Sequence, residues 1–252
     1  MARPTSLEQS PWLPSFGWWP HPDEFGLTVV LSTHHATTEP ASFFDVVLRG
    51  YAGSGEPLWE HDVGRIVHGE DRAVQLDELD IPPPPTRNGG VVEIHAIRGD
   101  RSPKRNVGFV GMWLDATGRG GGGYLIPTIP IRGQKKVVKR DDLQVIPGVV
   151  SSRDVETEIV LLNPILEPTR ARLVASSAGG LVVEGEWFDI EPFSAWRSPL
   201  SDALPRIRRL LAQDSGIGSL AVYSSHKILP YFGFRRAGQP LVSMDHSAPV
   251  FA

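Results

Sequence analysis

Residues 28–40 read TVVLSTHHATTEP, and residues 158–168 read EIVLLNPILEP. Each stretch begins with a run of aliphatic and β-branched residues, which is typical of a β-strand, and then turns and ends on Glu-Pro. The two stretches lie 130 residues apart, counted from Thr28 to Glu158. A strand and turn that recur at such a distance predict an all-β chain with an internal duplication.

Further pairs of segments recur in the same order along the chain. The longest pair is 45–63 with 171–190, and each member holds a strand, a glycine-rich turn and a return strand with a tryptophan. The other pairs, whose first residues lie 122, 127 and 125 residues apart, are 73–79 with 195–204, 89–97 with 216–225, and 106–111 with 231–236.

This order predicts two tandem, internally duplicated β-sandwich domains. The expected boundaries are 27–144 for the first domain and 145–252 for the second. Residues 1–26 are rich in proline and tryptophan and precede the first matched strand, so they are expected to form an N-terminal arm with no sheet of its own.

One segment has the pattern of a helix. Residues 201–214 open with a Ser-Asp pair suited to capping, and they place four apolar residues on one helical face, namely Leu204, Ile207, Leu210 and Leu211. The matching part of the first half, 80–86, contains four successive prolines and must be extended. We expect a helix at about 203–213 that covers the open end of the second sandwich.

Composition narrows the class of protein. The chain has 252 residues, of which 40% are hydrophobic, and it carries a formal net charge of −4. It contains no cysteine, which excludes disulfides, thiolate metal sites and cysteine nucleophiles. The N-terminus has no apolar stretch of signal-peptide length, and no later segment has the ~18 unbroken apolar residues of a membrane helix. We therefore expect a cytoplasmic protein without membrane contact.

Two adjacent histidines, His34 and His35, follow the first matched strand, and the second copy makes the same turn without them. A metal or catalytic centre would need further groups, and the candidates are His21, His95 and the pair Asp245-His246. His95 alternates in phase with Glu93, so we expect it on the solvent face of its strand. No ligand spacing recurs, and we therefore expect no metal and no cofactor.

The aromatic and basic segments provide candidate binding residues. Trp18 and Trp19 are expected to pack across the first sandwich or the domain junction, and the alternative is an aromatic ligand surface. Residues 98–140 hold ten Lys or Arg against two acids, which offers Arg105, Lys135 and Lys136 to an anionic ligand. The stretch lacks interleaved aromatics and helix signals, so nucleic acid is not favoured.

The glycine run at 118–123 fits a G-x-G-x-x-G pattern in form. A nucleotide-binding loop of this kind must lead into a helix, but Pro127 and Pro130 follow the run and forbid one. We interpret the run as a hairpin tip or a linker.

Residues 159–190, a strand, an Asn-Pro turn, a strand, a glycine turn and a strand, resemble bacterial immunoglobulin-like sandwich modules arranged in tandem. That resemblance implies a non-catalytic binding or assembly protein, with a protein partner, a second copy of the chain or an anionic ligand as the binding partner. The alternative is an enzyme with a site at the junction of the two sandwiches, using His34, His35 and Asp245-His246. A third interpretation is a binder of anionic ligands or polysaccharides through the basic stretch 98–140.

Overall fold

The computed structural model describes residues 14–33, 43–99, 109–115, 123–127, 129–130, 142–237, 241–246 and 248–249. The described part is predominantly β, as the sequence predicts. Its first lobe, residues 14–130, contains β1 (Ser15–Trp19), β2 (Gly26–Ser32), β3 (Phe43–Tyr51), β4 (Trp59–Val67), β5 (Asp71–Gln75), the 3-10 turn η2 (Leu76–Glu78), β6 (Gly90–Arg98), β7 (Phe109–Asp115), β8 (Gly123–Pro127) and β9 (Ile129–Pro130).

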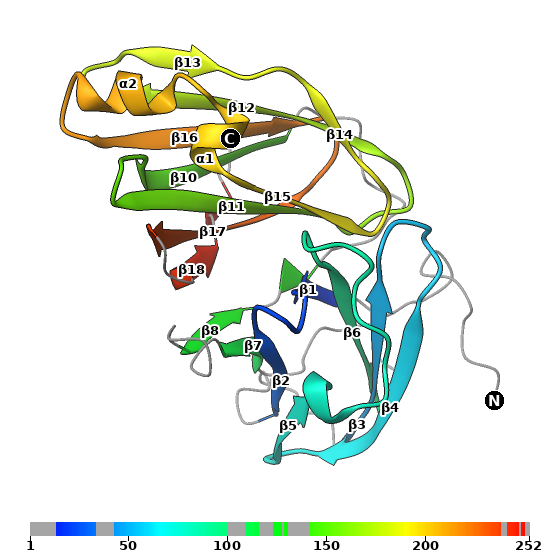
Figure 1. Cartoon of the computed structure of the whole chain (residues 1–252). Helices are drawn as coiled ribbons and strands as arrows, with labels where there is room; N and C mark the ends of the chain where they lie inside the picture. The colour runs from blue at the N-terminus through cyan, green and yellow to red at the C-terminus, as the bar shows by residue number, and fades with distance from the viewer. Residues whose placement is uncertain are drawn as a thin grey trace.

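The second lobe, residues 142–249, lies above the first in Figure 1. Its first strand spans the domain boundary expected at 144/145. The elements are β10 (Asp142–Val150), β11 (Val155–Asn163), β12 (Thr169–Ser177), β13 (Val182–Glu184), β14 (Phe188–Ile190), β15 (Ser194–Pro199), α1 (Leu200–Ala203), α2 (Ile207–Ala212), β16 (Ile217–Ser224), β17 (Leu229–Arg236), β18 (Leu241–His246) and β19 (Ala248–Pro249).

The strands form three antiparallel sheets. A four-stranded sheet runs β5-β2-β7-β8, and a six-stranded sheet runs β13-β12-β16-β10-β19 with β14 also on β12. The largest sheet joins the two lobes, because β15 of the second lobe pairs with β6 of the first at a single position, Ser194 opposite Gly90. On one side of that link lie β11, β17 and β18, and on the other lie β1, β3, β4 and β9.

The pairing of strands is alike in the two lobes. β2 pairs with β5 and β7 as β11 pairs with β15 and β17, and β7 and β17 continue to β8 and β18. β6 lies between β3 and β1 as β16 lies between β12 and β10. The outer strands also correspond, with β4 on β3, β13 and β14 on β12, β9 on β1, and β19 on β10.

Two clusters of buried apolar side chains form the core, and the first cluster crosses the junction between the lobes. β11 contributes to both clusters, since side chains alternate along a strand. Ile159 and Leu161 belong to the second cluster, whereas Val160 and Leu162 belong to the first. Other second-lobe members of the first cluster are Phe193, Ala195, Leu229, Tyr231 and Met244.

A buried arginine adds polar contacts at the same junction. Arg197 of β15 donates from Nε to Glu158 of β11, and its Nη1 lies 2.7 Å from Glu24 Oε2 of the first lobe. Its guanidinium also lies 5.2 Å from the ring centre of Trp18, and its side chain is only 7% exposed. Arg197 therefore holds a carboxylate from each lobe.

The N-terminal segment differs from the expectation of an arm outside the sheets. Residues 15–19 form β1, which pairs with β6 over five residues and with β9 on its other side. Trp18 and Trp19 are 0% and 3% exposed, and Trp19 meets Trp59 edge to face at 5.4 Å. These residues precede the first matched strand and hold no run of β-branched residues, so no strand was expected before residue 27.

The predicted helix is present as two short helices. Leu204 ends α1, and Pro205 separates it from α2, because proline lacks the amide that would continue the helical bonding. The expected apolar face is buried, with Leu204, Ile207, Leu210 and Leu211 at 9% exposure or less. Among the described residues no helix is long and apolar enough to cross a membrane.

Candidate functional site

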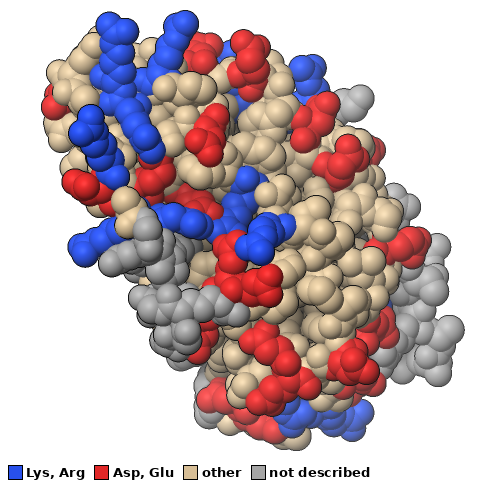
Figure 2. Space-filling model, viewed as in Figure 1, with Lys and Arg blue, Asp and Glu red and all other residues tan. Residues whose placement is uncertain are grey.

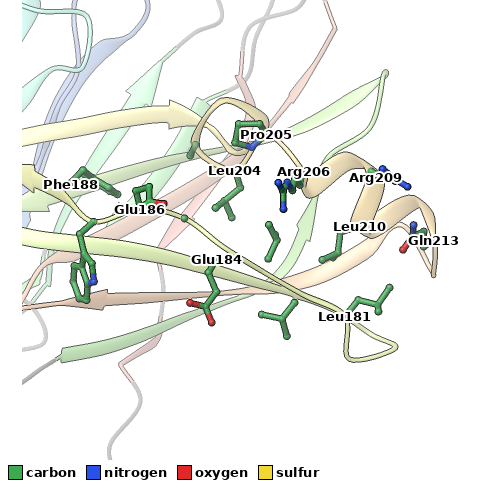
Figure 3. A pocket seen from close by; sticks show the side chains of 15 residues that line it. Leu181, Glu184, Glu186, Phe188, Leu204, Pro205, Arg206, Arg209, Leu210 and Gln213 are labelled. Carbon is green, nitrogen blue, oxygen red and sulfur yellow. The ribbon is translucent and has the colours of Figure 1, made fainter.

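A groove of about 980 Å³ opens on the second lobe, between the segment 181–188 and the two helices. β13 and the turn before β14 form one wall, and the residues 203–213 form the other. The two walls meet closely at one point, since a Cβ on Gly185 would lie 2.9 Å from Leu204 Cδ2. Figure 3 shows Leu204 and Leu210 pointing from the helix wall toward the strand.

The strand wall of the groove carries three large apolar side chains that are open to solvent. Leu181 is 45% exposed, Val182 57% and Trp187 41%. Exposed side chains of this size are common singly, but three of them in a run of seven residues form a patch of the kind that binds ligands or partners.

The helix wall of the groove is basic. Arg206 and Arg209 are exposed, and no ion pair or hydrogen bond of either guanidinium is present among the described residues. Figure 2 shows Lys and Arg side chains gathered at the end of the molecule where α2 lies in Figure 1. The opposite wall carries two acids, of which Glu184 is occupied by Arg172 at 3.0 Å. The free cations of the groove are thus on one side.

Arginines also flank Trp187 at the mouth of the groove. Arg170 and Arg172 lie 5.6 and 5.3 Å from its ring centre, and Arg172 lies 5.4 Å from that of Tyr223. The Nε of Arg172 is buried without a hydrogen-bond partner. These cation–π contacts favour the observed position of the Trp187 ring beside the groove.

A second cluster of reactive side chain types is buried in the first lobe, on β3 and β6. The Tyr51 hydroxyl donates to Glu93 Oε2 at 2.6 Å, and His95 Nδ1 lies 3.2 Å from Glu93 Oε1. Arg49 Nη1 lies 3.6 Å from Glu93 Oε2, and Arg49 Nε donates to Glu60 Oε2 at 2.8 Å. The strand register explains the cluster, because Arg49 stands opposite Glu93 and Val47 opposite His95.

Burial governs the chemistry of this polar cluster. Burial first, and then the charge of Glu93 and the hydrogen bond to it, raise the pKa of Tyr51 far above the ordinary value of a phenol. Tyr51 therefore stays protonated and serves as a hydrogen-bond donor. Glu93 is fully buried and Tyr51 is 3% exposed, so a substrate has no open path to the carboxylate in this structure.

Several of the site residues expected from sequence lie outside the described residues: His34, His35, Arg105, Lys135 and Lys136. Asp245 is exposed on β18, and His246 ends that strand in register with Tyr231. Trp18 and Trp19 are buried and offer no surface to a ligand. Within the ranges that the structure describes, no group of three His, Asp or Glu side chains is arranged to hold a metal.

The expectation for His95 is wrong. Both faces of β6 are covered at its middle, and His95 is 4% exposed rather than solvent-facing. Sequence reasoning also missed Tyr51 and the groove. The alternation of Arg49 with Tyr51 and of Glu93 with His95 was a usable signal, since i and i+2 residues share a face of a strand. The groove had no such signal, because its walls are far apart in sequence.

Comparisons with known proteins give no family. No protein-family model matches the chain, and no curated protein matches it. Among solved structures, Bacteroides uniformis beta-glucuronidase 2 covalently bound to cyclophellitol-6-carboxylate aziridine aligns at 9% identity and a TM-score of 0.19, over 94% of this chain and 26% of that chain. A second structure of Bacteroides uniformis beta-glucuronidase aligns at 10% identity with the same TM-score and the same coverage.

The chain thus spans about a quarter of the length of these glucuronidase chains. Similarity at that TM-score carries no argument about fold or activity.

Proposed function

We propose that the chain is a non-catalytic binding protein, built from two tandem β-sandwich lobes, whose second lobe holds its ligand in the groove between β13 and α2. The observation that supports this proposal is the groove itself, which combines exposed apolar side chains on one wall with two guanidiniums on the other, those of Arg206 and Arg209, that have no partner within the described part of the chain. A concave site with apolar walls and a few polar groups is the usual form of a binding site.

The proposed architecture of two duplicated sandwiches rests on the matched pairing of strands in the two lobes. A second observation supports it. Thr33 directly follows β2 and Asn163 ends β11, and both are fully buried. Thr33 Oγ1 lies 3.0 and 2.9 Å from the carbonyl oxygens of Val67 and Glu70, at the end of β4, and Asn163 Nδ2 donates to those of Ile190 and Glu191, at the end of β14. Each thus ties the end of its strand to the end of a neighbouring outer strand, and this likeness supports the proposed duplication.

The enzyme alternative has weaker support. Its strongest basis in the described residues is the Tyr51–Glu93–His95 cluster, and that cluster is closed to solvent. A buried, hydrogen-bonded polar network of this kind commonly fixes strand packing instead. The groove, in contrast, is open and lies in the other lobe.

The test is a ligand screen with a matched pair of variants. Wild-type protein is applied to an array of peptides and oligosaccharides, together with Val182→Arg and Val67→Arg. Both valines are more than half exposed on outer strands, at 57% and 53%, but only Val182 lines the groove. We expect that at least one ligand of the array binds to wild type and to Val67→Arg but not to Val182→Arg. Equal retention by all three proteins, or no retained ligand, would contradict the proposal.

A further inference from the structure

β13 leaves a free strand edge along the groove. It pairs with β12 only, so one of its edges has no partner strand among the described residues. The Gly185 amide donates to Leu173 and the Ser177 amide to Leu181, both at 2.9 Å. Because inward and outward bonding alternates along an antiparallel strand, Val182 and Glu184 point their N–H and C=O groups away from β12.

The protection of this edge is limited to its short length, three residues, and to the charge of Glu184. Charges, prolines or bulges usually prevent an exposed edge from pairing with another chain. β4, the outer strand of the first lobe, has a bulge opposite Val46/Val47 and carries Glu60, Asp62 and Arg65. β13 reads Val-Val-Glu with no bulge in its pairing, and the exposed Leu181 precedes it. The edge at β13 is therefore available to a further strand.

The far wall of the groove does not occupy that edge. α2 lies against β13 through side chains, and none of the described backbone hydrogen bonds joins the two elements. The segment 203–213 instead lines the groove with Leu204 and Leu210, and with Arg206 and Arg209 beside them. An added strand would thus meet apolar side chains and two cations.

From these contacts we infer that the groove binds an extended acidic peptide, which adds to β13 as a strand. The inference rests on the proposed binding function and specifies its ligand. The backbone of the peptide pairs with Val182 and Glu184, its apolar side chains lie on Leu204 and Leu210, and its carboxylates bond the free guanidiniums. Strand addition of this type takes affinity from main-chain bonds and specificity from side chains.

The probe is a fluorescein-labelled peptide about six residues long, Val-Ser-Glu-Ser-Val-Ser, which matches an ordinary strand and places valine and glutamate on the same face. Fluorescence anisotropy at low salt should report binding to the full chain. A peptide with lysine in place of glutamate should bind at least about tenfold more weakly, and so should the acidic peptide to Arg206→Glu/Arg209→Glu. Arg153→Glu, which changes an exposed arginine of the β10–β11 turn, should bind like wild type.

Methylated peptides test the strand pairing separately. N-methylation of every second amide blocks the bonds on one edge of the peptide, and two such peptides cover both registers. One of the two should lose binding and the other should keep it. Equal binding of both methylated forms to wild type would overturn strand addition, and equal binding of the glutamate and lysine peptides would overturn the acidic preference.

A uronic acid oligosaccharide serves as the competing anionic ligand. If it binds in a manner that Val182→Arg abolishes while the acidic peptide does not bind, the peptide inference fails and the groove remains the binding site. If the peptide does not bind, and the array ligands bind Val182→Arg as well as wild type, both the inference and the proposed function fail. Unchanged melting curves of the variants exclude unfolding as the cause of a loss.

Discussion

Leu161 and Leu162 give a direct test of whether the two lobes form one folding unit. They are adjacent on β11 and both are fully buried, but Leu161 belongs to the second core cluster and Leu162 to the cluster that crosses into the first lobe. Replacing each by alanine makes the same chemical change on opposite faces of one strand. The pair therefore compares the core of the second lobe with the junction.

The expected size follows from burial. Leucine to alanine removes three carbons, and at about 0.8 kcal/mol for each buried carbon the transfer loss is about 2.4 kcal/mol. The unfilled cavity adds to this, which gives roughly 3–4 kcal/mol for each variant within the range of buried leucines. For a chain of this size, 1 kcal/mol lowers Tm by roughly 2–4 °C, so each variant should melt about 6–16 °C below wild type.

Differential scanning calorimetry is the suitable assay, because it resolves separate transitions. If the shared core couples the lobes, wild type and both variants should melt in one transition, and the two variants should shift it by similar amounts. Two transitions, with Leu161→Ala lowering only one of them, would refute the coupling. So would a Leu162→Ala variant within about 1 °C of wild type, since that result would mean that the junction buries no cohesive surface.

Three further measurements test other parts of the structure. Arg197→Met should lower the free energy of unfolding by about 3 kcal/mol, because Glu158 stays buried with Arg235 as its remaining cation, and Arg153→Met should change it little. Leu211→Ala in α2 should cost roughly 2–4 kcal/mol, whereas Leu166→Ala, 43% exposed, should cost under about 0.5. Burial raises the pKa of Tyr51 and of Tyr231. Above about pH 10 the folded chain therefore keeps both phenol protons, whereas the unfolded chain loses them. Urea titrations in that range should show the free energy of unfolding falling by roughly 1.4 kcal/mol per pH unit for each tyrosine. Tyr231→Phe should halve that slope, and an unchanged slope would contradict the assignment.

The strands of the chain could be predicted because their signal is local. Alternating runs such as 91–97 and 158–162 are strands in the structure, since a period of two fits a pleated segment whatever its neighbours are. The apolar face of α1 and α2 was predicted on the same basis. β1 was missed, because its short aromatic segment between prolines has no run of β-branched residues.

The solvent exposure of β6 and β11 could not be predicted, because it depends on contacts between distant segments. Alternation in Glu93 and His95 resembles that of a half-exposed strand, but the outer face of β6 is covered in the fold. β11 is buried by the core of its own lobe on one face and by the cluster that crosses into the first lobe on the other. The continuous apolar run at 159–162 is typical of a strand buried on both faces, but it does not show which distant segment covers the second face.

The register of the matched halves was also beyond the sequence. Aligning Asp45 with Ala171 gives a good sequence match, but Phe44, Val46 and Leu48 face the first core while Ala171, Leu173 and Ala175 face the second. The core-facing positions of the two strands are thus offset by one residue from the sequence match. A shift of one residue exchanges the two faces of a strand, and strand sequences of similar composition tolerate it.

Under the proposed duplication, the groove of the second lobe has no counterpart in the described part of the first lobe. The connection after the fourth matched strand accounts for this difference. Leu76 and Leu200 both follow the fourth matched strand, both are buried, and both begin a helical turn, η2 in one lobe and α1 in the other. After that point the first lobe continues through the prolines of 82–85, which cannot continue a helix, while the second continues into α2. α2 supplies the basic wall that faces β13, and the equivalent edge of the first lobe has neither that wall nor a regular strand. A binding site confined to one copy is what this difference predicts, and it is why a change at Val182 and the same change at Val67 should differ in effect.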